Sequence, residues 1–356
     1  MNKKNVITIK SLFALVAFFV AGQTNQLFSN IIGSIAAVTR QNGVTSFNAA
    51  GAPNVILGFT SIQGGLILAG SATTCTWNAL FPIVGGRFKL FGGQLFLQRD
   101  LVLSGTSLTI TSSGSILAVG NSITLGPFLS DLSLTPTLVL DTATLVLSQN
   151  VRISSSLRLR NRCKIDGQGK RITLQGNGEI DVLPGGNLTI ENAEIWGVKK
   201  NNVRCFSDRG AITFRNCYLY LAQDYTFSSG SFFVDDHFVI TGTNKFIYTT
   251  GLTSTIGSSS MFFFDLGTTL SYNPRVANPN LIFMTDMTSN LYLNGCTLYS
   301  TRTGLQLSSG TLIIDDTVTF TSEARYSSEA MIISSNLTTK VLGRATIDLY
   351  GFIRYD

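Results

Sequence analysis

Apolar and polar residues alternate in short runs through the stretch from Leu157 to Val198. Each run is followed by a glycine-rich break: Gly-Gln-Gly, Gly-Asn-Gly or Pro-Gly-Gly. Apolar residues at every second position indicate a strand with one buried face, and glycines after each run indicate a tight turn. The pattern therefore predicts many short strands. The clearest apolar pairs are Leu157/Leu159, Ile172/Leu174, Ile180/Val182 and Leu188/Ile190.

The segment Leu188–Ile195 (LTIENAEI) recurs along the chain, with apolar and turn residues at matching positions. Its copies are 212–219 (ITFRNCYL), 232–239 (FFVDDHFV), 291–298 (LYLNGCTL) and the looser 312–316 (LIIDD) and 342–347 (LGRATI). Anchored on the second apolar residue, the steps are 24, 20, 21 and 28 residues, with a gap of 59 between Val234 and Leu293. A period of about 20–25 residues that contains only strands and turns indicates an all-β solenoid, the single-stranded parallel β-helix. Leucine-rich repeats would need helical segments, and a sandwich would not repeat one register.

The chain divides into three predicted segments. Residues 1–22 have the form of a signal peptide: a basic start, the apolar run Leu12–Val20, and small residues before Gln23. An uncleaved anchor or a hydrophobic first strand is the alternative. Residues 23–85 are expected to hold a capping helix within 23–40, followed by irregular first coils. We interpret residues 86–356 as one continuous parallel β-helix, because apolar pairs recur from Phe88/Leu90 onward without a charged or Pro-rich linker.

The charge of the chain argues against nucleic acid as a partner. The formal net charge is +6, but the predicted leader carries three lysines and no acidic residue, so its removal leaves +3. No basic cluster interleaved with aromatic residues remains, so nucleic-acid binding is not supported. A cleaved leader would also leave the mature chain without a transmembrane segment. We expect the protein to be exported, to the periplasm, the cell surface or the medium.

The five cysteines do not have zinc-site spacing, and their odd number leaves at least one thiol unpaired. They are Cys75, Cys163, Cys205, Cys217 and Cys296. In the repeat register, Cys217 and Cys296 share a column with Ala193, Thr317 and Ala345, which suggests an inward position for small side chains. We expect the thiols to fill the core, and a Cys205–Cys217 disulfide is the alternative.

Four residues are the best candidates for chemistry: Asp235, Asp236, His237 and Arg215. Many β-helices cleave acidic polysaccharides, and a hydrolase or lyase needs converging carboxylates or a base on one face. The alternative is structural. Glu191, Arg215 and Asp235 would then stack as an alternating charge ladder on coils about 4.8 Å apart. Asn192, Asn216 and Asp236 would form a second ladder at the turn.

In this register, His237 falls in the column of small residues, so it is either squeezed inside or turned outward by a local irregularity. Asp315 and Asp316 lie at least three coils further on, too far to share a catalytic centre with Asp235. Asp166, in the segment Asp-Gly-Gln-Gly, has turn chemistry. We expect no cofactor and no metal site.

The segment Cys163–Gly169 (CKIDGQG), followed by ITL at 172–174 and NLTIEN at 187–192, resembles the right-handed parallel β-helix proteins of the pectin-lyase-like superfamily. It is also similar to long exported bacterial β-helix proteins built from such coils. The resemblance covers about residues 140–350 and implies the fold. Polygalacturonase-like members carry Asn-Thr-Asp, Asp-Asp, Gly-His-Gly and Arg-Ile-Lys motifs. Only an Asp-Asp pair is present here, so no catalytic residue carries over.

These patterns favour a non-enzymatic exported β-helix, acting as a structural or adhesive surface protein. Its partners would be surface glycans or further copies of itself, joined end to end or side by side. The alternative is a carbohydrate-active enzyme, a polysaccharide lyase or glycoside hydrolase, that uses Asp235, Asp236 and Arg215 or His237. A viral tailspike-like fibre shares the fold, but the leader peptide argues against it.

Overall fold

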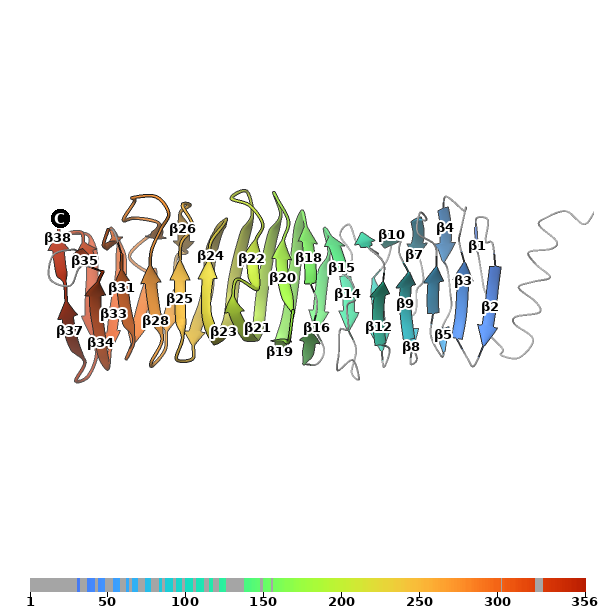
Figure 1. Cartoon of the computed structure of the whole chain (residues 1–356), viewed down its shortest axis with the longest axis horizontal. Helices are drawn as coiled ribbons and strands as arrows, with labels where there is room; N and C mark the ends of the chain where they lie inside the picture. The colour runs from blue at the N-terminus through green and yellow to red at the C-terminus, as the bar shows by residue number, and fades with distance from the viewer. Residues whose placement is uncertain are drawn as a thin grey trace, which may run out of the picture.

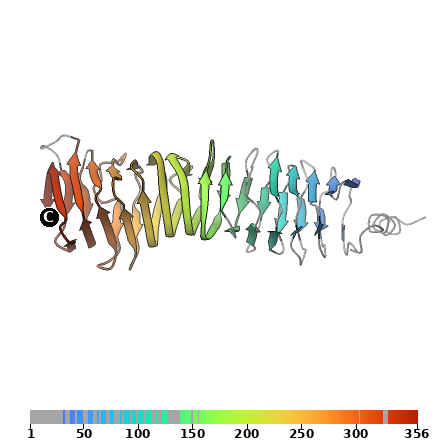
Figure 2. The ribbon, with the colours of Figure 1, turned by 90° about the horizontal axis from the view of Figure 1, so that it is seen from below.

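The computed structural model forms a long rod, with the chain advancing from one end to the other coil by coil (Figure 1). The same stacking is visible after a quarter turn about the long axis (Figure 2). The structure describes residues 31–32, 37–41, 44–48, 54–57, 62–63, 66–69, 74–77, 83–84, 87–91, 94–97, 100–104, 107–111, 115–117, 122–125, 138–147, 150–154, 156–301, 303–323 and 329–356. The predicted leader, residues 1–22, lies outside these ranges.

Strands are the only regular elements among the described residues, and they form four sheets. One sheet has nine strands: β1 (Ile31–Ile32), β4 (Asn54–Leu57), β7 (Thr74–Trp77), β10 (Gln94–Leu97), β13 (Ser115–Leu117), β15 (Leu138–Asp141), β18 (Ser156–Arg160), β20 (Glu179–Val182) and β22 (Val203–Cys205). Another has five: β2 (Ala37–Gln41), β3 (Val44–Asn48), β6 (Leu66–Ala69), β9 (Arg87–Phe91) and β12 (Ser107–Thr111). A third has three: β32 (Leu305–Leu307), β35 (Glu329–Ile333) and β38 (Phe352–Tyr355).

The largest sheet winds along the rod. Its strands are β5 (Ile62–Gln63), β8 (Ile83–Val84), β11 (Leu101–Ser104), β14 (Ser122–Leu125), β16 (Thr144–Leu147), β17 (Val151–Ile153), β19 (Arg162–Leu174), β21 (Asn187–Lys200), β23 (Ala211–Phe227), β24 (Ser231–Thr241), β25 (Lys245–Tyr248), β26 (Ser254–Ile256), β27 (Met261–Phe264), β28 (Thr269–Tyr272), β29 (Ile282–Met284), β30 (Asn290–Asn294), β31 (Thr297–Ser300), β33 (Gly310–Asp315), β34 (Thr317–Ser322), β36 (Leu337–Val341) and β37 (Thr346–Tyr350).

Successive coils pair in parallel, which confirms the predicted all-β parallel solenoid. Ile190 pairs with Phe214, and Phe214 pairs with Val234, so the predicted column of inward residues is present. The column continues to Ile256 and Met284, and all five side chains are buried. Each coil thus covers the apolar face of its neighbour, which no coil could bury alone.

The predicted capping helix is wrong for the described residues of 23–40. Ile31 and Ile32 form β1, which pairs antiparallel with β4, and β2 pairs antiparallel with β3. The β-branched residues Ile31, Ile32, Val38 and Thr39 favour extended chain over helix. The remaining residues of 23–40 lie outside the described part of the chain. Parallel pairing is already present before residue 86, between β4 and β7 and between β3 and β6.

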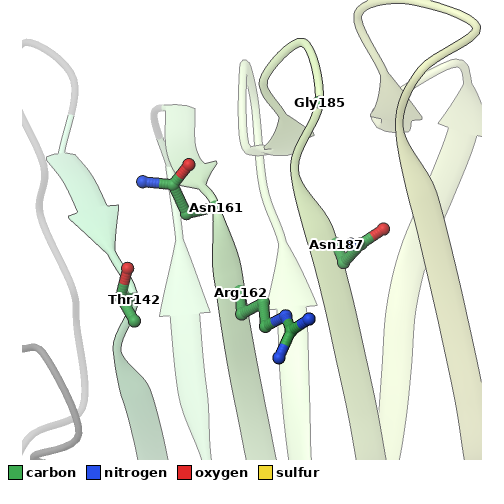
Figure 3. A pocket seen from close by; sticks show the side chains of 5 residues that line it. All are labelled: Thr142, Asn161, Arg162, Gly185 and Asn187. Carbon is green, nitrogen blue, oxygen red and sulfur yellow. The ribbon is translucent and has the colours of Figure 1, made fainter.

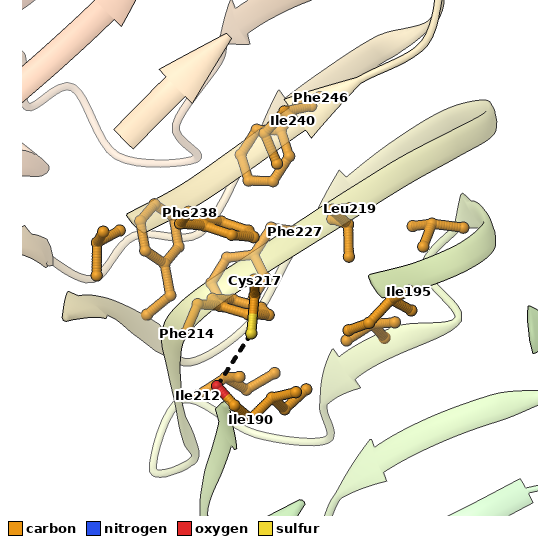
Figure 4. Packing of buried hydrophobic residues seen from close by; sticks show 14 of the residues in the cluster. Ile190, Ile195, Ile212, Phe214, Cys217, Leu219, Phe227, Phe238, Ile240 and Phe246 are labelled. Atoms are coloured by element: carbon orange, nitrogen blue, oxygen red, sulfur yellow. Dashed lines mark hydrogen bonds between the residues drawn. The ribbon is translucent and has the colours of Figure 1, made fainter. Parts of the chain in front are cut away.

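Aromatic rings fill much of the core between β23 and β28. Phe238 stacks on Phe214 and on Phe262, with ring centroids 4.0 and 5.2 Å apart. Figure 4 shows this packing from close by, with Phe227 and Phe246 among the same cluster. The buried Tyr248 hydroxyl donates to the carbonyl of Leu281 at 2.9 Å. The polar atom of this large buried side chain is therefore hydrogen-bonded.

Four cysteines lie in the core as free thiols, namely Cys163, Cys205, Cys217 and Cys296, so the alternative of a Cys205–Cys217 disulfide is wrong. Cys75 lies in β7, and its side chain is outside the description. The Cys217 thiol donates to the carbonyl of Ile190 at 3.1 Å (Figure 4), and burial raises its pKa to about 12. Core filling is thus confirmed for these four.

The five proposed members of the small-residue column do not form one column. Cys217 does pair with Ala193, but its next partner is Phe238, and Thr317 is exposed. Cys296 lies at a different corner of the coil, described below. None of the described residues forms a helix long and apolar enough to span a membrane.

Candidate functional site

The candidate residues Arg215 and Asp235 lie side by side on adjacent coils. Arg215 pairs in register with Glu191 on one side and Asp235 on the other. Its Nε donates to Asp235 Oδ2 at 2.8 Å, and its Nη1 donates to Glu191 Oε2 at 3.4 Å. Lys164 Nζ adds a contact of 2.5 Å to Glu191 Oε1. The predicted charge ladder is therefore present.

Asp236 and His237 form the turn that follows, which we name the first corner, with Asn192 and Asn216 in the preceding coils. Asn192, Asn216 and Asp236 have φ values of 51, 49 and 78°, in the left-handed region that Asn and Asp tolerate better than most residues. Asn216 Nδ2 donates to Asn192 Oδ1 at 3.0 Å. The ladder of Asn side chains is present between these two coils, and the Asp236 backbone N–H donates instead to Ser260 Oγ at 2.9 Å.

His237 is turned outward by a local irregularity, which resolves the two alternatives left open by the sequence. The register shifts after Arg215, so Cys217 faces Phe238 and Leu219 faces Ile240. The first corner thus has one residue more in this coil, and Ile240 takes the inward place expected for Val239. His237 Nδ1 lies 2.5 Å from Asp236 Oδ1, and both side chains are about half exposed.

The other acidic pair lies at a different turn. Leu293 pairs with Phe264, Phe264 with Ile240, and Ile240 with Leu219, so the segments at 291–298 and 312–316 follow another strand row. We name this turn the second corner; it holds Asn294–Gly295 and Asp315–Asp316. The structure does not bring Asp315 or Asp316 next to Asp235. Among the described residues there is also no group of three His, Cys, Asp or Glu side chains placed to hold a metal ion.

A shallow hollow of about 310 Å³ lies at a third turn, and Figure 3 shows its lining. Thr142, Asn161, Arg162, Gly185 and Asn187 line it. Asn161 Nδ2 donates to Asp141 Oδ1 at 2.6 Å, and the Thr142 hydroxyl donates to the same oxygen at 2.9 Å. None of the four candidates for chemistry, Arg215, Asp235, Asp236 and His237, lines this hollow.

Aromatic side chains line one outer surface of the rod, on β21, β23, β27 and β30. We name this surface the aromatic face, and it comprises Trp196, Tyr218, Tyr220, Phe263 and Tyr292. Register places them in two adjacent outward columns: Tyr218, Val239, Phe263 and Tyr292 in one, and Trp196 and Tyr220 in the other. Outward positions of such strands are usually polar, so rings gathered on four coils of one surface are informative.

The rings of the aromatic face contact one another along the axis. Trp196 and Tyr220 stack with centroids 4.0 Å apart, and the Arg171 guanidinium lies 4.0 Å from the Trp196 ring. Phe263 and Tyr292 meet edge to face at 4.6 Å. Tyr218 is the most exposed of the five, at 41%. These contacts hold the rings in place before any partner binds.

Polar groups border the aromatic face. The Tyr292 hydroxyl donates to Asp315 Oδ2 at 2.7 Å, and this bond raises the tyrosine pKa to about 12. Asn294 Nδ2 donates to Asp265 Oδ1 at 3.1 Å in the neighbouring column. His237 borders the opposite side, since it pairs in register with Met261 while Val239 pairs with Phe263. The surface therefore combines fixed rings with carboxylates, an amide and an imidazole.

Sequence reasoning missed this surface, although a signal was present. The runs Tyr218-Leu-Tyr, Phe262-Phe-Phe and Leu291-Tyr-Leu place large apolar residues in both phases of the strand alternation. An apolar residue in the second phase points away from the core. The inward residues of each strand predict the fold, but they give no information on the rings at the outward positions.

A second outer surface carries charges instead. We name it the ion-pair face, and it comprises Arg158, Glu179, Asp181 and Arg204 on β18, β20 and β22, with Arg158, Asp181 and Arg204 in register. Arg204 donates to Asp181 Oδ1 and to Glu179 Oε2, both at 3.0 Å. Asp181 is fully buried beneath these side chains, and burial raises its pKa from 3.8 to about 6 despite Arg204. Phe206 lies against both arginines.

Comparison with other proteins adds no assignment to these surfaces. No family model, curated protein or solved structure matches the chain.

Proposed function

We propose that this chain is an exported β-helix with a structural and adhesive role, which binds glycans of a cell surface through its aromatic face. The observation that carries the proposal is the set of outward rings on two pairs of adjacent coils, β21 with β23 and β27 with β30, bordered by Asp265, Asn294 and Asp315. On the motif resemblance, we also assign the chain to the pectin-lyase-like superfamily, with the right-handed winding that this implies. Fold alone brings no activity.

The chemistry of sugars suits such a surface. A sugar ring has apolar C–H patches that pack against aromatic rings, and hydroxyls that pair with carboxylates and amides. Ligand sites generally combine aromatic side chains with a few placed polar groups in this way. Arg171 and Tyr220 cover the two faces of Trp196, so the most open ring for a sugar is Tyr218.

The ladder at Arg215 supports a binding role over catalysis. A general acid or base needs a carboxyl within reach of its substrate and tuned toward the working pH. Asp235 Oδ2 already accepts two hydrogen bonds from the Arg215 guanidinium, and Arg215 also contacts Glu191. The Asp235 oxygen that a substrate would have to reach is therefore already occupied by the guanidinium.

The test is a binding screen of the purified protein against neutral and acidic surface glycans. For each glycan that binds, the double variant Tyr218→Ser/Phe263→Ser is expected to weaken binding at least tenfold. Phe233→Ser is the matched control, because Phe233 is a ring of similar exposure, 37% against 41% for Tyr218, on a different strand row. Absence of binding by the parent, or equal loss in the control, would overturn the proposal.

One observation favours the alternative of a carbohydrate-active enzyme. Asp236 and His237 are exposed, in contact, and at the border of the aromatic face. A bound glycan could therefore reach an imidazole held by a carboxylate, an arrangement suited to proton transfer. Release of reducing ends or unsaturated products, measured across acidic glycans, tests this. Activity that is lost in a folded Asp236→Ala variant would replace the adhesive role by catalysis.

Export is the remaining part of the proposal, and the basic, apolar start of the sequence supports it. Cell fractionation followed by protease treatment of intact cells tests it. Recovery of the protein only inside the cytoplasm would contradict export.

A further inference from the structure

An apolar row follows the rod axis through the aromatic face and one coil further. It consists of Tyr218, Val239, Phe263, Tyr292 and Ile313, and each pairs in register with the next. We name these five residues the apolar stripe. Tyr218 is exposed and the other four are partly exposed. Because neighbouring coils lie about 4.8 Å apart, the stripe is roughly 19 Å long and one side chain wide.

Polar side chains border the apolar stripe. The adjacent outward column continues from Tyr220 to Thr241, Asp265, Asn294 and Asp315. Asp265 accepts hydrogen bonds from the Thr241 hydroxyl at 3.2 Å and from Asn294 Nδ2 at 3.1 Å. Over these coils, neither the stripe nor this column contains a lysine or an arginine. The surface therefore offers apolar contact along its length, with acceptors and negative charge at its edge.

We propose that the glycan bound by the aromatic face is an uncharged, extended chain with β-1,4 linkages, lying lengthwise over the apolar stripe. This inference rests on the proposed adhesive function and names the class of its ligand. Equatorial bonds at both ends of each sugar, as in β-1,4-linked glucose, make such a chain flat and straight. One sugar advances it by nearly the height of one coil, which is about 4.8 Å. Successive sugars therefore lie over successive side chains of the stripe.

The shape of the stripe excludes a bent ligand. An α-1,4-linked chain of the same sugar curves, because one of the two bonds at each sugar is axial. Such a chain leaves a straight row of side chains after a few sugars. The sugar faces carry C–H groups that pack on the apolar stripe, so contact is gained only while the chain stays straight.

The charges at the edge of the stripe select against an acidic ligand. Asp265 and Asp315 are the charged residues of the bordering column, and both are acidic, so a glycan carboxylate is repelled. An ionised carboxylate has about four acceptor positions. Asp265 uses two of them for Thr241 and Asn294, which leaves acceptor capacity for the hydroxyls of an uncharged sugar.

Isothermal titration calorimetry of the purified full chain with three hexasaccharides tests the proposal. Cellohexaose is uncharged and β-1,4-linked. Maltohexaose contains the same sugar with α-1,4 linkages, and a β-1,4-linked hexamer of glucuronate keeps the linkage and adds carboxylates. Cellohexaose is expected to bind at least tenfold more tightly than either. Its affinity is expected to rise with chain length up to about five sugars, one for each coil of the stripe.

Three variants locate the ligand. Ile313→Ser shortens the stripe beyond the rings and is expected to weaken cellohexaose binding at least threefold. Ile247→Ser is the matched control, because it makes the same change at a partly exposed, outward isoleucine on another strand row, and it leaves binding unchanged. Asp265→Asn/Asp315→Asn removes the bordering charges and is expected to strengthen binding of the glucuronate hexamer at least tenfold. Circular dichroism checks that each variant is folded.

The proposal is refuted if maltohexaose or the glucuronate hexamer binds as tightly as cellohexaose. It is also refuted if Ile313→Ser and Ile247→Ser have equal effects, or if the Asn variant gains no affinity for the acidic hexamer. The adhesive function fails by a different result, namely that no glycan binds in a manner that depends on Tyr218 and Phe263. A glycan of another class whose binding does depend on them keeps the adhesive function and refutes this ligand class.

Discussion

The ion-pair face and the aromatic face are built by the same rule and have opposite properties. Both use outward positions of parallel strands, one per coil. On the ion-pair face, Arg158, Asp181 and Arg204 alternate in charge: Arg204 Nε donates to Asp181 Oδ1 at 3.0 Å, and Arg158 Nε lies 3.9 Å from Asp181 Oδ2. On the aromatic face, Tyr218, Phe263 and Tyr292 repeat one kind of side chain and leave C–H surface open. The inward alternation fixes the fold, while the outward columns are free to specialise.

The largest expected effect comes from opening the ion-pair face. Arg204→Ala removes the group that pairs with the fully buried Asp181 carboxylate, and loss of one partner of a buried pair costs about 3–5 kcal/mol. Denaturant unfolding near pH 7.5 measures the change. The variant Arg204→Met/Asp181→Leu should recover most of the stability, because an apolar pair has no uncompensated charge. A loss below about 1 kcal/mol for Arg204→Ala would show that this face does not depend on its charges.

The pH dependence of the unfolding free energy tests the same difference between the ion-pair face and the aromatic face. Burial raises the Asp181 pKa from 3.8 to about 6, so the folded protein holds this proton more tightly than the unfolded chain. The resulting stability is fully present below about pH 4 and is lost as pH rises through about 6. A shift of this size corresponds to about 3 kcal/mol. The difference in unfolding free energy between the parent and Asp181→Asn, measured from pH 4 to 7.5, is expected to change by about 3 kcal/mol. A constant difference would contradict the assignment.

The aromatic face should contribute less to stability. Trp196→Ala removes a ring stacked on Tyr220 and covered by Arg171, contacts that together contribute about 1–2 kcal/mol. Denaturant unfolding measures it against Tyr218→Ala, where a change within about 0.5 kcal/mol is expected for an exposed ring. A larger loss for Tyr218→Ala would mean that this surface is structural in the way the ion-pair face is.

The smallest effect is expected at the charge ladder of the first corner. Arg215→Ala removes an exposed ion pair with Asp235 and a longer, partly buried one with Glu191, each contributing about 1 kcal/mol or less, and Lys164 still pairs with Glu191. Thermal unfolding at low and high salt measures it, and the small difference from the parent should shrink as salt screens the charges. A salt-independent loss of several kcal/mol would place this ladder with the buried pairs instead.

Sequence alone predicts the solenoid because its signals are local. Alternation sets which side chains of a strand point inward, and the left-handed turn residues Asn192 and Asn216 set where each strand bends. The column of Ile190, Phe214 and Val234 and the ladder at Arg215 follow from these two signals. They require no knowledge of distant contacts.

The corner of the coil at which each copy of the repeat lies could not be predicted in this way. The segment Leu291–Leu298 reads like Leu188–Ile195, because any corner needs inward residues around a residue that tolerates positive φ. Gly295, with a φ of 51°, meets that need at the second corner as Asn192 does at the first. In the coil of β26 and β27 the first corner is the longer turn 257–260, which lacks this pattern, and the pattern reappears at the second corner. The one added residue at Asp236–His237 likewise shifts the register of the residues that follow, and a repeat template of fixed length cannot predict such a shift.

The reactivity of the four core thiols reports local unfolding of the rod. Only a thiolate reacts readily with an alkylating reagent, and burial keeps Cys205, Cys217 and Cys296 protonated as well as covered. Each thiol is therefore alkylated only after its own coil has separated from the next. Because Cys163, Cys217 and Cys296 lie in different coils, the order in which they become labelled reports where the stack of coils first comes apart.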